Sequence, residues 1–392
     1  MSDEKQEAND VSVDALSART VASITDIPAK DWNALAAPSP CTANPFVSHE
    51  FLYALEASGS AIAETGWAPV HILIERHGEI AAAAPAYLKS HSYGEYVFDH
   101  HWADAFERVG GRYYPKVLCA SPFTPVSGPR LLTRDKSLKP VLADTFLSLM
   151  RAAGSNTTHL NFLNDTDAAI LEEQGFLLRR GIQYHWFNRG YSSFDEFLSA
   201  LASRKRKAIR RERRDAVEGV TIHKLTGAEI TEDALDAFWG FYQDTGARKW
   251  GRPYLTRSFF SFAADLMRDR MLLVIAKSEG RSIAGALNFI GGDALYGRYW
   301  GCLEDRPFLH FELCYYQAID FAIENGLARV EAGAQGEHKI ARGYEPVLTT
   351  SAHWIENLQL RKAVARAILA ESGHVRAEAG ALAEYVPYRK GE

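Results

Sequence analysis

The sequence predicts an α/β (α+β) protein made of two similar units, each built around a mixed sheet. The chain has 392 residues, more than one hydrophobic core usually organises, so two domains are expected. Runs typical of strands alternate with amphipathic helices in both halves. The pattern glycine, aromatic, eight residues, His-Trp occurs twice, from Gly175 to Trp186 and from Gly343 to Trp354, which two diverged copies of one unit would explain.

The first unit, residues 21–188, begins with a hairpin in which two β-rich runs between residues 66 and 89 flank a Gly turn. A proline-rich stretch, residues 113–130, is predicted to be an irregular loop. An amphipathic helix over 138–154 ends at a glycine and leads into a strand at 158–163. The first His-Trp repeat then closes the unit before a boundary rich in Gly and Ser.

The second unit, residues 189–392, repeats this order. A basic helix opens it, a hairpin with a Gly turn covers 271–292, and a helix over 309–326 leads into a strand at 328–334. We treat His185-Trp186 and His353-Trp354 as structural, because duplicated architecture explains both pairs at once.

Composition limits the classes of protein that the chain can belong to. Hydrophobic residues make up 47% and charged residues 24%, as in ordinary globular domains. The formal net charge of -5 argues against a general nucleic-acid coat, and no DNA partner is expected. The 4 cysteines form no CxxC pair, which fits a reduced compartment better than a zinc site or a disulfide scaffold.

The first 20 residues are acidic and lack the basic and apolar regions of a secretory signal, so we expect residues 1–20 to be a disordered tail. No stretch reaches the roughly 18 consecutive apolar residues of a membrane span, so no transmembrane segment is expected. These features together predict a cytoplasmic protein.

The helix that opens the second unit has an unusual concentration of charge. Residues 204–214 contain eight Lys or Arg and a single acid, Glu212. On a helical wheel the cations form one face, while Leu198, Leu201, Ala208 and Ile209 form the other. A solvated surface is the plain alternative, but like charges at this spacing repel one another. An anion bound by residues such as Arg206 and Arg210 would offset that repulsion, and phosphates of RNA, of a coenzyme or of a lipid head group would serve.

Several stretches together resemble the FemAB-like branch of the GNAT acyltransferase superfamily, over roughly residues 44–360. The stretches that carry the resemblance are RKRKAIRRERRDAVEGVTI (204–222), the pair Thr245 and Arg248, the helix and strand at 309–334, AGAQGEHKIARGYEP (332–346), and, in the first half, NPFVSHEFLYALE (44–56), FDHHWADAF (98–106) and YYPKVLCASPFTPVSGPRLL (113–132).

The resemblance implies two tandem GNAT-like (acyl-CoA N-acyltransferase) domains and an N-acyltransferase activity of the kind found in peptidoglycan biosynthesis. It also implies a co-substrate, acyl-CoA or aminoacyl-tRNA, in place of a tightly bound cofactor. Acetyl-CoA-dependent members carry a glycine loop that binds pyrophosphate after the fourth strand. This chain has CLEDRPFLHFELC (302–314) at that place, as in FemAB proteins, whose donor resembles an aminoacyl-tRNA.

The stretch GAQGEHK, residues 333–339, offers the groups that acyl transfer to an amine needs. Glu337 or His338 could accept the amine's proton, and Lys339 could face the oxyanion or a phosphate. The alternative is a polar turn that begins a short surface helix. The first unit has NFLNDTD at the corresponding place, so we place the chemistry in the second unit.

Further candidates are binding residues for the donor or the acceptor. His310 and Glu312 lie in the first turn of a predicted helix, where anions are favoured, although a core helix is the alternative. The remaining candidates are Gln335 and Arg342 beside the catalytic stretch and Lys116, Arg130, Asp99 and Trp102 around the proline-rich loop, where the acceptor would bind. A metal site at residues 99–104 is disfavoured, because adjacent histidines on a strand point to opposite faces.

The sequence therefore predicts amide formation on a small-molecule or peptide amine by direct attack. No GxSxG-like setting holds a nucleophile, so no covalent enzyme intermediate is expected. tRNA is a candidate partner. The alternative hypothesis is a non-catalytic module of the same fold that binds RNA or an anionic surface.

Overall fold

The computed structural model describes residues 16–39, 43–249, 253–333 and 336–389. The strands are β1 (Leu16–Val21), β2 (Trp67–Pro69), β3 (His71–Arg76), β4 (Glu79–Ala84), β5 (Ala86–Lys89), β6 (Lys116–Cys119), β7 (Leu132–Thr133), β8 (Thr157–Leu163), β9 (Leu177–Phe187), β10 (Thr221–Thr226), β11 (Met271–Ser278), β12 (Arg281–Ile290), β13 (Ala294–Cys302), β14 (Arg329–Glu331) and β15 (Glu345–Ile355).

The α-helices are α1 (Ala29–Ala36), α2 (His49–Ala57), α3 (His100–Arg108), α4 (Lys139–Ala152), α5 (Asp165–Glu173), α6 (Phe194–Ala200), α7 (Ser203–Ala216), α8 (Glu232–Lys249), α9 (Arg257–Met267), α10 (Leu309–Phe311), α11 (Gln317–Glu324) and α12 (Leu358–Ala383). A π-helical turn, η8 (Glu312–Tyr316), joins α10 to α11, and a 3-10 helix, η9 (Glu337–Arg342), precedes β15.

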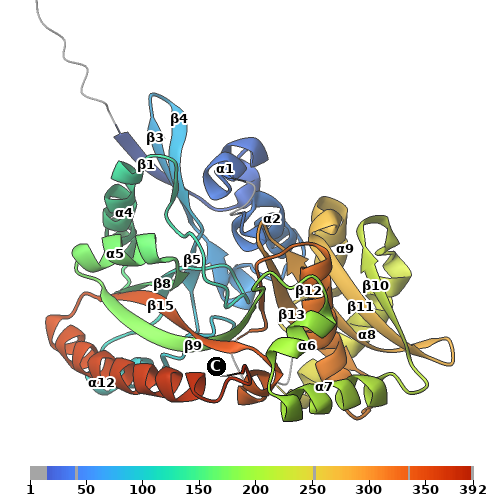
Figure 1. Ribbon diagram of the computed structural model, residues 1–392. Helices are drawn as coiled ribbons and strands as arrows, with labels where there is room; N and C mark the ends of the chain where they lie inside the picture. Colours follow the sequence, from blue (N-terminus) through green and yellow to red (C-terminus); the bar gives the residue numbers. More distant parts are fainter. Residues whose placement is uncertain (1–15, 40–42, 250–252, 334–335, 390–392) are drawn as a thin grey trace, which may run out of the picture.

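One mixed sheet of 11 strands runs through both halves of the described chain, in the order β10-β11-β12-β13-β14-β9-β15-β8-β6-β5-β2 (Figure 1). A smaller sheet, β1-β3-β4-β7, flanks the first half. The long sheet contains two parallel pairs, β6 with β8 in the first half and β13 with β14 in the second. Each half thus has a parallel pair near the centre of the sheet.

The last strand of each half pairs with the other half. β9 pairs with β14, and β15 pairs with β8, while β9 and β15 pair with each other from Leu177 with His353 to His185 with Glu345. The two His-Trp repeats are 168 residues apart (353 − 185 = 168), and the same offset relates Gly181 to Thr349 (349 − 181 = 168), which are direct partners in the ladder. An approximate two-fold axis therefore passes between Gly181 and Thr349, as the internal repeat predicts.

Both predicted hairpins are present and turn in the same way. His77-Gly78 joins β3 to β4, and Glu279-Gly280 joins β11 to β12, all four residues with positive φ. Two such residues between antiparallel strands are the signature of a tight turn whose twist matches the strands. The helices predicted over 138–154 and 309–326 appear as α4 and as the run α10-η8-α11.

The structure differs from the sequence prediction in four segments. Residues 16–20, expected in a disordered tail, belong to β1, which pairs with β3. His100 and His101 begin helix α3 and do not lie on a strand. Lys116–Cys119 is strand β6, so the proline-rich loop is shorter than predicted.

The basic helix is the fourth difference, because it is two helices, α6 and α7. The chain's C-terminal segment lies at the break between them. Ala202 donates to the carbonyl of Pro387, and Arg389 donates to the carbonyl of Ala200. Leu198 and Leu201 therefore do not share a helix with the cations.

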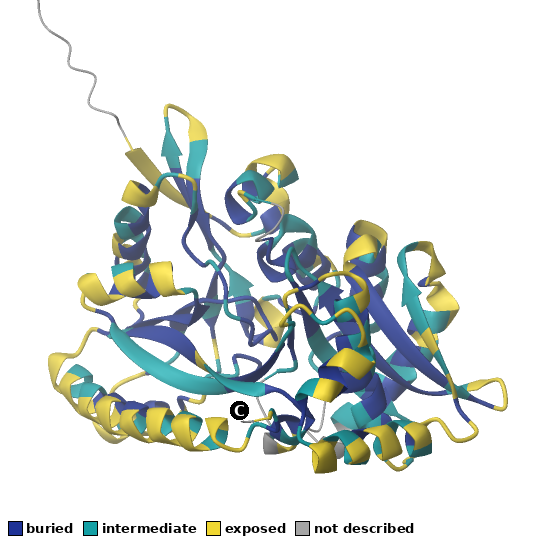
Figure 2. Cartoon of the chain, in the orientation of Figure 1, coloured by how far each residue is buried: buried dark blue, intermediate teal, exposed yellow. Residues whose placement is uncertain are grey.

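The largest apolar cluster contains residues of both halves, such as Trp32 and Phe51 with Phe238 and Phe289, so the halves share a core. Helix α12 packs beneath β9 and β15 and, like α7, has a mostly exposed outer face (Figure 2). Among the described residues, no helix has the length and apolar character that crossing a membrane requires.

Candidate active site

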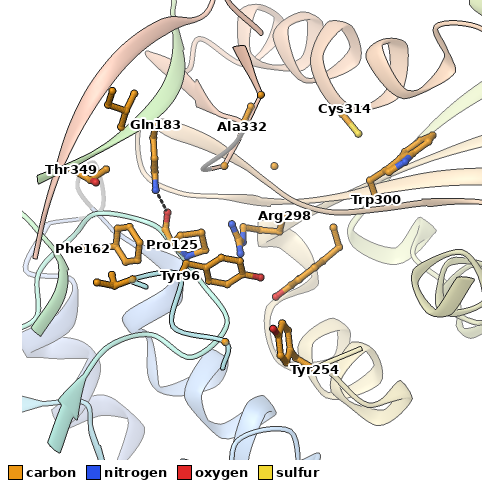
Figure 3. A pocket seen from close by; sticks show the side chains of 18 of the residues that line it. Tyr96, Pro125, Phe162, Gln183, Tyr254, Arg298, Trp300, Cys314, Ala332 and Thr349 are labelled. Carbon is orange, nitrogen blue, oxygen red and sulfur yellow. Dashed lines mark hydrogen bonds between the residues drawn. The ribbon is translucent and has the colours of Figure 1, made fainter. Parts of the chain in front are cut away.

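A cavity of 1010 Å³ lies between the two halves at the centre of the long sheet. The first half contributes the loop of residues 92–98 and Pro125, and the second half contributes β12, β13 and the segment around η9. The paired strands β9 and β15 form a third wall (Figure 3). There Gln183 of β9 donates to the carbonyl of Pro125 at 2.6 Å, which ties the central strands to the first half.

The cavity opens where β13 and β14 separate. These parallel strands pair only from Ala294 with Arg329 to Tyr296 with Glu331, and then diverge. Residues 297–300 of β13 line one side of the gap, and Ala332 and Gly333 line the other. Ligands of α/β folds bind in such crevices at the carboxyl ends of parallel strands.

The segment after β14 owes its shape to glycines. Gly336 has φ 109°, and a Cβ there would lie 2.4 Å from the His338 ring. Gly343, with φ 89°, ends η9. Glycine at 336 therefore permits both the backbone conformation and the position of His338.

Lys339 is buried at the wall of the cavity, with 3% of its surface exposed. Its Nζ donates to the carbonyl oxygens of Ala332 at 2.6 Å and Gly333 at 3.1 Å. A lysine ammonium has three donors, and among the described residues the third has no acceptor. Burial lowers the pKa of Lys339 to about 8, and the charge of Arg298 contributes to this decrease.

His338 lies beside Lys339 on the cavity wall, within a group of aromatic rings. Its Nε2 is 3.0 Å from the hydroxyl of Tyr315, which is on the π-helical turn η8. The rings of Phe311 and His310 lie 5.5 and 6.2 Å away, between centroids. π-helical turns often occur at functional sites, and this one brings Tyr315 and Cys314 to the cavity.

Of the catalytic and adjacent candidates, the cavity brings together His338, Lys339 and His310. Glu337 is the first residue of η9, but its side chain, like all of Gln335, lies outside the described residues. Arg342 does not line the cavity. Its guanidinium donates to the carbonyl of His338 at 2.7 Å and to Glu212 of α7 at 2.9 Å, so it holds η9 in place.

Glu312 does not line the cavity. Its side chain is 1% exposed and pairs with Arg213 at 2.9 Å, and it also accepts from Gln317 at 2.7 Å. The carboxylate is therefore occupied by contacts within the protein. It anchors α7 against η8.

The first-half candidates Lys116, Asp99 and Trp102 lie behind the wall of the cavity and not on it. Lys116 is fully buried, with its Nζ 2.9 Å from Glu95 and hydrogen-bonded to Asp99 and Ser92. Burial opposes the ionised form of Asp99, but the charge of Lys116 outweighs this effect, so the pKa of Asp99 is lowered. Burial raises the pKa of Glu95 to about 7. This cluster anchors the loop 92–98 from behind.

The remaining candidates also lie away from the cavity. Arg130 is buried and donates to the carbonyls of Asn161, Pro129 and Val126. Arg206 is half-buried, and Arg210 is exposed and pairs with Asp195 at 2.8 Å. Arg213, expected on the exposed stripe, points inward to Glu312 and Asp320.

Sequence reasoning missed several polar residues of the cavity, above all Arg298, Arg180 and Tyr96. Arg298 interrupts an apolar strand, ALYGRYWG, and a charge within a strand that is buried on both faces is a usable signal. Tyr96 lies in a loop with no regular pattern, and no sequence signal marks it. Among the described residues, no group of three or more His, Cys, Asp or Glu side chains could hold a metal ion.

Comparison with solved structures shows the fold. FemX is 15% identical, with a TM-score of 0.55 over 86% of this chain and 98% of FemX. The C-terminal domain of a putative lysylphosphatidylglycerol synthetase from Agrobacterium fabrum is 11% identical, with a TM-score of 0.52 over 90% of this chain and 97% of that domain. L-PGS from Bacillus licheniformis is 12% identical, with a TM-score of 0.50 over 83% of this chain and 97% of that protein.

These likenesses and the internal two-fold repeat identify two tandem GNAT-like units that share a mixed sheet. No curated protein matches the sequence significantly. The model of the FemAB-like family, described as peptidoglycan biosynthesis/recognition, matches residues 23–390. The chain therefore belongs to the FemAB-like family.

Proposed function

We propose that the protein is an N-acyltransferase, in which an amine attacks an acyl donor directly in the cavity beside Lys339. Membership of the FemAB-like family supports a transferase. The observation that carries the proposal is Lys339, a buried ammonium with one donor unused among the described residues, at the point where β13 and β14 diverge. A donor fixed in a partly dry site stabilises charge that develops in a transition state.

In the proposed reaction the amine nitrogen forms a bond to the acyl carbon, and the bond to the leaving group breaks. Lys339 donates to the carbonyl oxygen as negative charge develops there. His338 takes the proton that the amine loses and returns it to the leaving thiolate or alkoxide. The nearby Tyr315 hydroxyl, 3.0 Å from Nε2, orients the imidazole. Glu337 remains an alternative proton acceptor.

The donor is an acyl-CoA or an aminoacyl-tRNA, and the acceptor is a small-molecule or peptide amine. Only the acyl end of a tRNA would enter a cavity of 1010 Å³, so the rest must lie on the surface. The exposed cations of α7 support this arrangement, because Glu212 and Arg342 connect α7 directly to η9. Phosphates bound there would lie on the same side of the molecule as the candidate catalytic segment.

The test has a binding stage and a turnover stage. Thermal-shift measurements with acyl-CoA thioesters and with charged and uncharged tRNA identify the donor, because a bound ligand raises the melting temperature. Turnover with that donor is then measured for Lys339→Met, His338→Gln and Glu337→Gln, with Lys277→Met as the control outside the cavity. We expect Lys339→Met to lose about 100-fold or more in kcat while still binding the donor. Turnover unchanged in all three variants would exclude the proposal.

A second candidate function is a non-catalytic module that binds RNA or an anionic surface. The exposed cationic face of α7 favours it. In that case Arg206→Ala with Arg210→Ala abolishes a salt-dependent binding, whereas Lys339→Met has no effect on any measured function.

A further inference from the structure

Arg298 occupies an unusual position for a charged residue. It lies on β13, lines the cavity and has its guanidinium 5.5 Å from the centre of the Tyr299 ring. Its Nη2 donates to the carbonyl of Phe123 at 2.8 Å, across the boundary between the halves. Its Nε is buried and has no partner among the described residues. Figure 3 shows the side chain beside Tyr96 within the cavity.

The first-half segments around Arg298 contain strained backbone. Tyr96, Phe123 and Phe162 all have positive φ, of 60°, 57° and 56°. Tyr96 and Phe162 line the cavity, and Phe123 supplies the carbonyl that holds Arg298. Each such residue costs about 1–3 kcal/mol and persists only where its surroundings enforce it, which is common at binding sites. The loop that contains Tyr96 is enforced from behind by the buried Lys116 cluster.

The charges on the cavity wall do not balance. Arg179 is neutralised by Glu371, with which it makes hydrogen bonds of 2.9 and 2.7 Å. Arg180, Arg298 and Lys339 also line the cavity, and within the described ranges no carboxylate pairs with any of the three. Buried and half-buried cations without a counter-charge are costly unless a ligand supplies one. Arg298 also repels the ammonium of Lys339, which an anion between them would relieve.

We infer that the acceptor amine of the proposed reaction carries an anionic group, a carboxylate or a phosphate, that binds Arg298 while the amine reaches Lys339 and His338. The inference rests on the proposed function and specifies its substrate class. With an aminoacyl-tRNA as donor, only the acyl end would enter the cavity, so the anionic group belongs to the acceptor. The guanidinium fork suits both oxyanions, since each accepts two parallel N–H bonds.

The geometry also divides the work between the halves. Lys339 and His338 belong to the second half, whereas Arg298 is aimed by Tyr96 and by the carbonyl of Phe123 in the first half. The first half thus acts as the specificity element of a site whose reacting groups lie in the second.

The test uses three amines that differ only in their anionic group: ethanolamine, β-alanine and O-phosphoethanolamine. Each is titrated into the full-length protein without donor, and heat is measured. We expect β-alanine or O-phosphoethanolamine to bind at least about tenfold more tightly than ethanolamine, and the tighter of the two identifies carboxylate or phosphate. Equal binding of ethanolamine, or no binding of either anionic probe, overturns the inference.

Variants assign the binding to Arg298. Arg298→Gln should lower the affinity for the anionic probe by about tenfold or more, and Arg298→Lys, which retains the charge, should recover part of it. Arg281→Gln, on the same strand pair but exposed, is the matched control and should bind as the wild type does. Arg298→Lys also keeps the test decisive if Arg298→Gln does not fold. The inference is overturned if Arg298→Gln binds the anionic probe as tightly as the wild type does. If only Arg298→Lys folds, wild-type affinity in that variant overturns it as well.

The two proposals fail in distinguishable ways. If the anionic probes bind through Arg298 but no donor yields an amide, the proposed function fails and the anion site stands. If ethanolamine is acylated as fast as the anionic amines, and Arg298→Gln does not change that, the inference fails and the acyltransferase stands.

Discussion

The two halves contain the same parallel strand pair, but only the second leaves it open. In the first half the pairing of β6 with β8 ends at Cys119 and Leu160. Beyond that point the loop after β6 lies beside β8 in place of the strand. Gly128 forms a parallel bridge with Leu163, and its N–H donates to the carbonyl of Phe162 at 3.0 Å. In the second half no described segment fills the gap between β13 and β14, and the cavity lies there.

A buried cation binds equivalent carbonyls in both halves. The strand pairing aligns His159 of β8 with Glu331 of β14, because each pairs with the histidine of a His-Trp repeat, so Asn161 corresponds to Gly333. Arg130 donates to the carbonyl of Asn161, and Lys339 donates to that of Gly333. Arg130 also donates to the backbone carbonyls of Pro129 and Val126, whereas Lys339 has one donor that is directed at no described acceptor and is left for a ligand in the cavity.

The comparison shows that equivalent places of the two halves are used differently, since the buried cation of the first half contacts only backbone and that of the second half faces the cavity. The loop, the arginine and the Lys116 cluster of the first half all close or brace that unit. Buried cations in the first half should therefore increase stability, and the one in the second half should decrease it while serving function. Five predictions test this contrast.

The largest effect is expected at Lys116. Lys116→Met leaves the buried carboxylates of Glu95 and Asp99 without a counter-charge, which should cost about 3–5 kcal/mol of unfolding free energy in urea denaturation. The exposed Lys30, changed to Met, is the control and should stay within about 0.5 kcal/mol. A loss at Lys116 as small as the control would mean that this cluster does not brace the first half.

The next effect contrasts the equivalent cations at neutral pH. Arg130→Met leaves three carbonyls, two of them buried, without their donor and should cost about 3 kcal/mol. Lys339→Met should instead raise stability by about 1 kcal/mol, because relief of the buried charge exceeds the loss of two hydrogen bonds. Equal losses in the two variants would contradict the division of roles.

The gain from Lys339→Met also depends on pH. Lys339 has a pKa of about 8 in the folded protein against 10.5 in the unfolded chain, so the unfolded chain binds more protons between these values. Wild-type stability from this group therefore rises from pH 8 to pH 10.5, and its cost is fully present below pH 8. By pH 10.5 the gain of the variant should be lost and reversed, because the difference between the folded and unfolded pKa values outweighs a gain of about 1 kcal/mol, and a constant difference would show that the lysine is not desolvated.

Sequence reasoning reached the duplication but not the way in which the copies combine. The His-Trp repeats and the two Gly turns are local patterns, and both recur in the structure at equivalent places. The exchange of β9 and β15 between halves depends on pairings such as Ser351 with Arg179, more than 150 residues apart in the chain, which no local pattern encodes. The loop that lies beside β8 in the first half could not be predicted for the same reason, because Gly128 and Leu163 are distant in the chain.

The candidate site was predicted in part for similar reasons. His338 and Lys339 follow a predicted strand within a glycine-rich segment, so local rules place them at the end of a sheet. The pairing of Glu312 could not be predicted, because its partner, Arg213, lies on another helix 99 residues earlier. Arg298 was missed because its role depends on the first half's loops, whose conformations rest on strained residues.

A smaller effect should distinguish a steric contact with His338 from backbone strain at a glycine of the open gap. Gly336→Ala and Gly326→Ala each place a side chain at positive φ, which should cost about 1 kcal/mol in both. Only at Gly336 would the new Cβ meet the His338 ring, so only that variant should also lose about tenfold in turnover. Similar turnover in the two variants would remove His338 from the reaction.

The smallest effect on stability is expected on the outer face of α7. Arg206 is half-buried and Arg210 is exposed, and the ion pair of Arg210 with Asp195 lies in solvent. Substitution of either arginine by Gln should therefore change the free energy of unfolding by less than about 0.5 kcal/mol. If tRNA is the donor, each substitution should reduce the slope of log affinity against log salt by about 1. The exposed Arg270, changed to Gln, should leave that slope unaltered. The described part of the first half has no such basic helix before its own parallel strands. An unaltered slope in all three variants would therefore leave the open gap, and not α7, as the feature that distinguishes the second half.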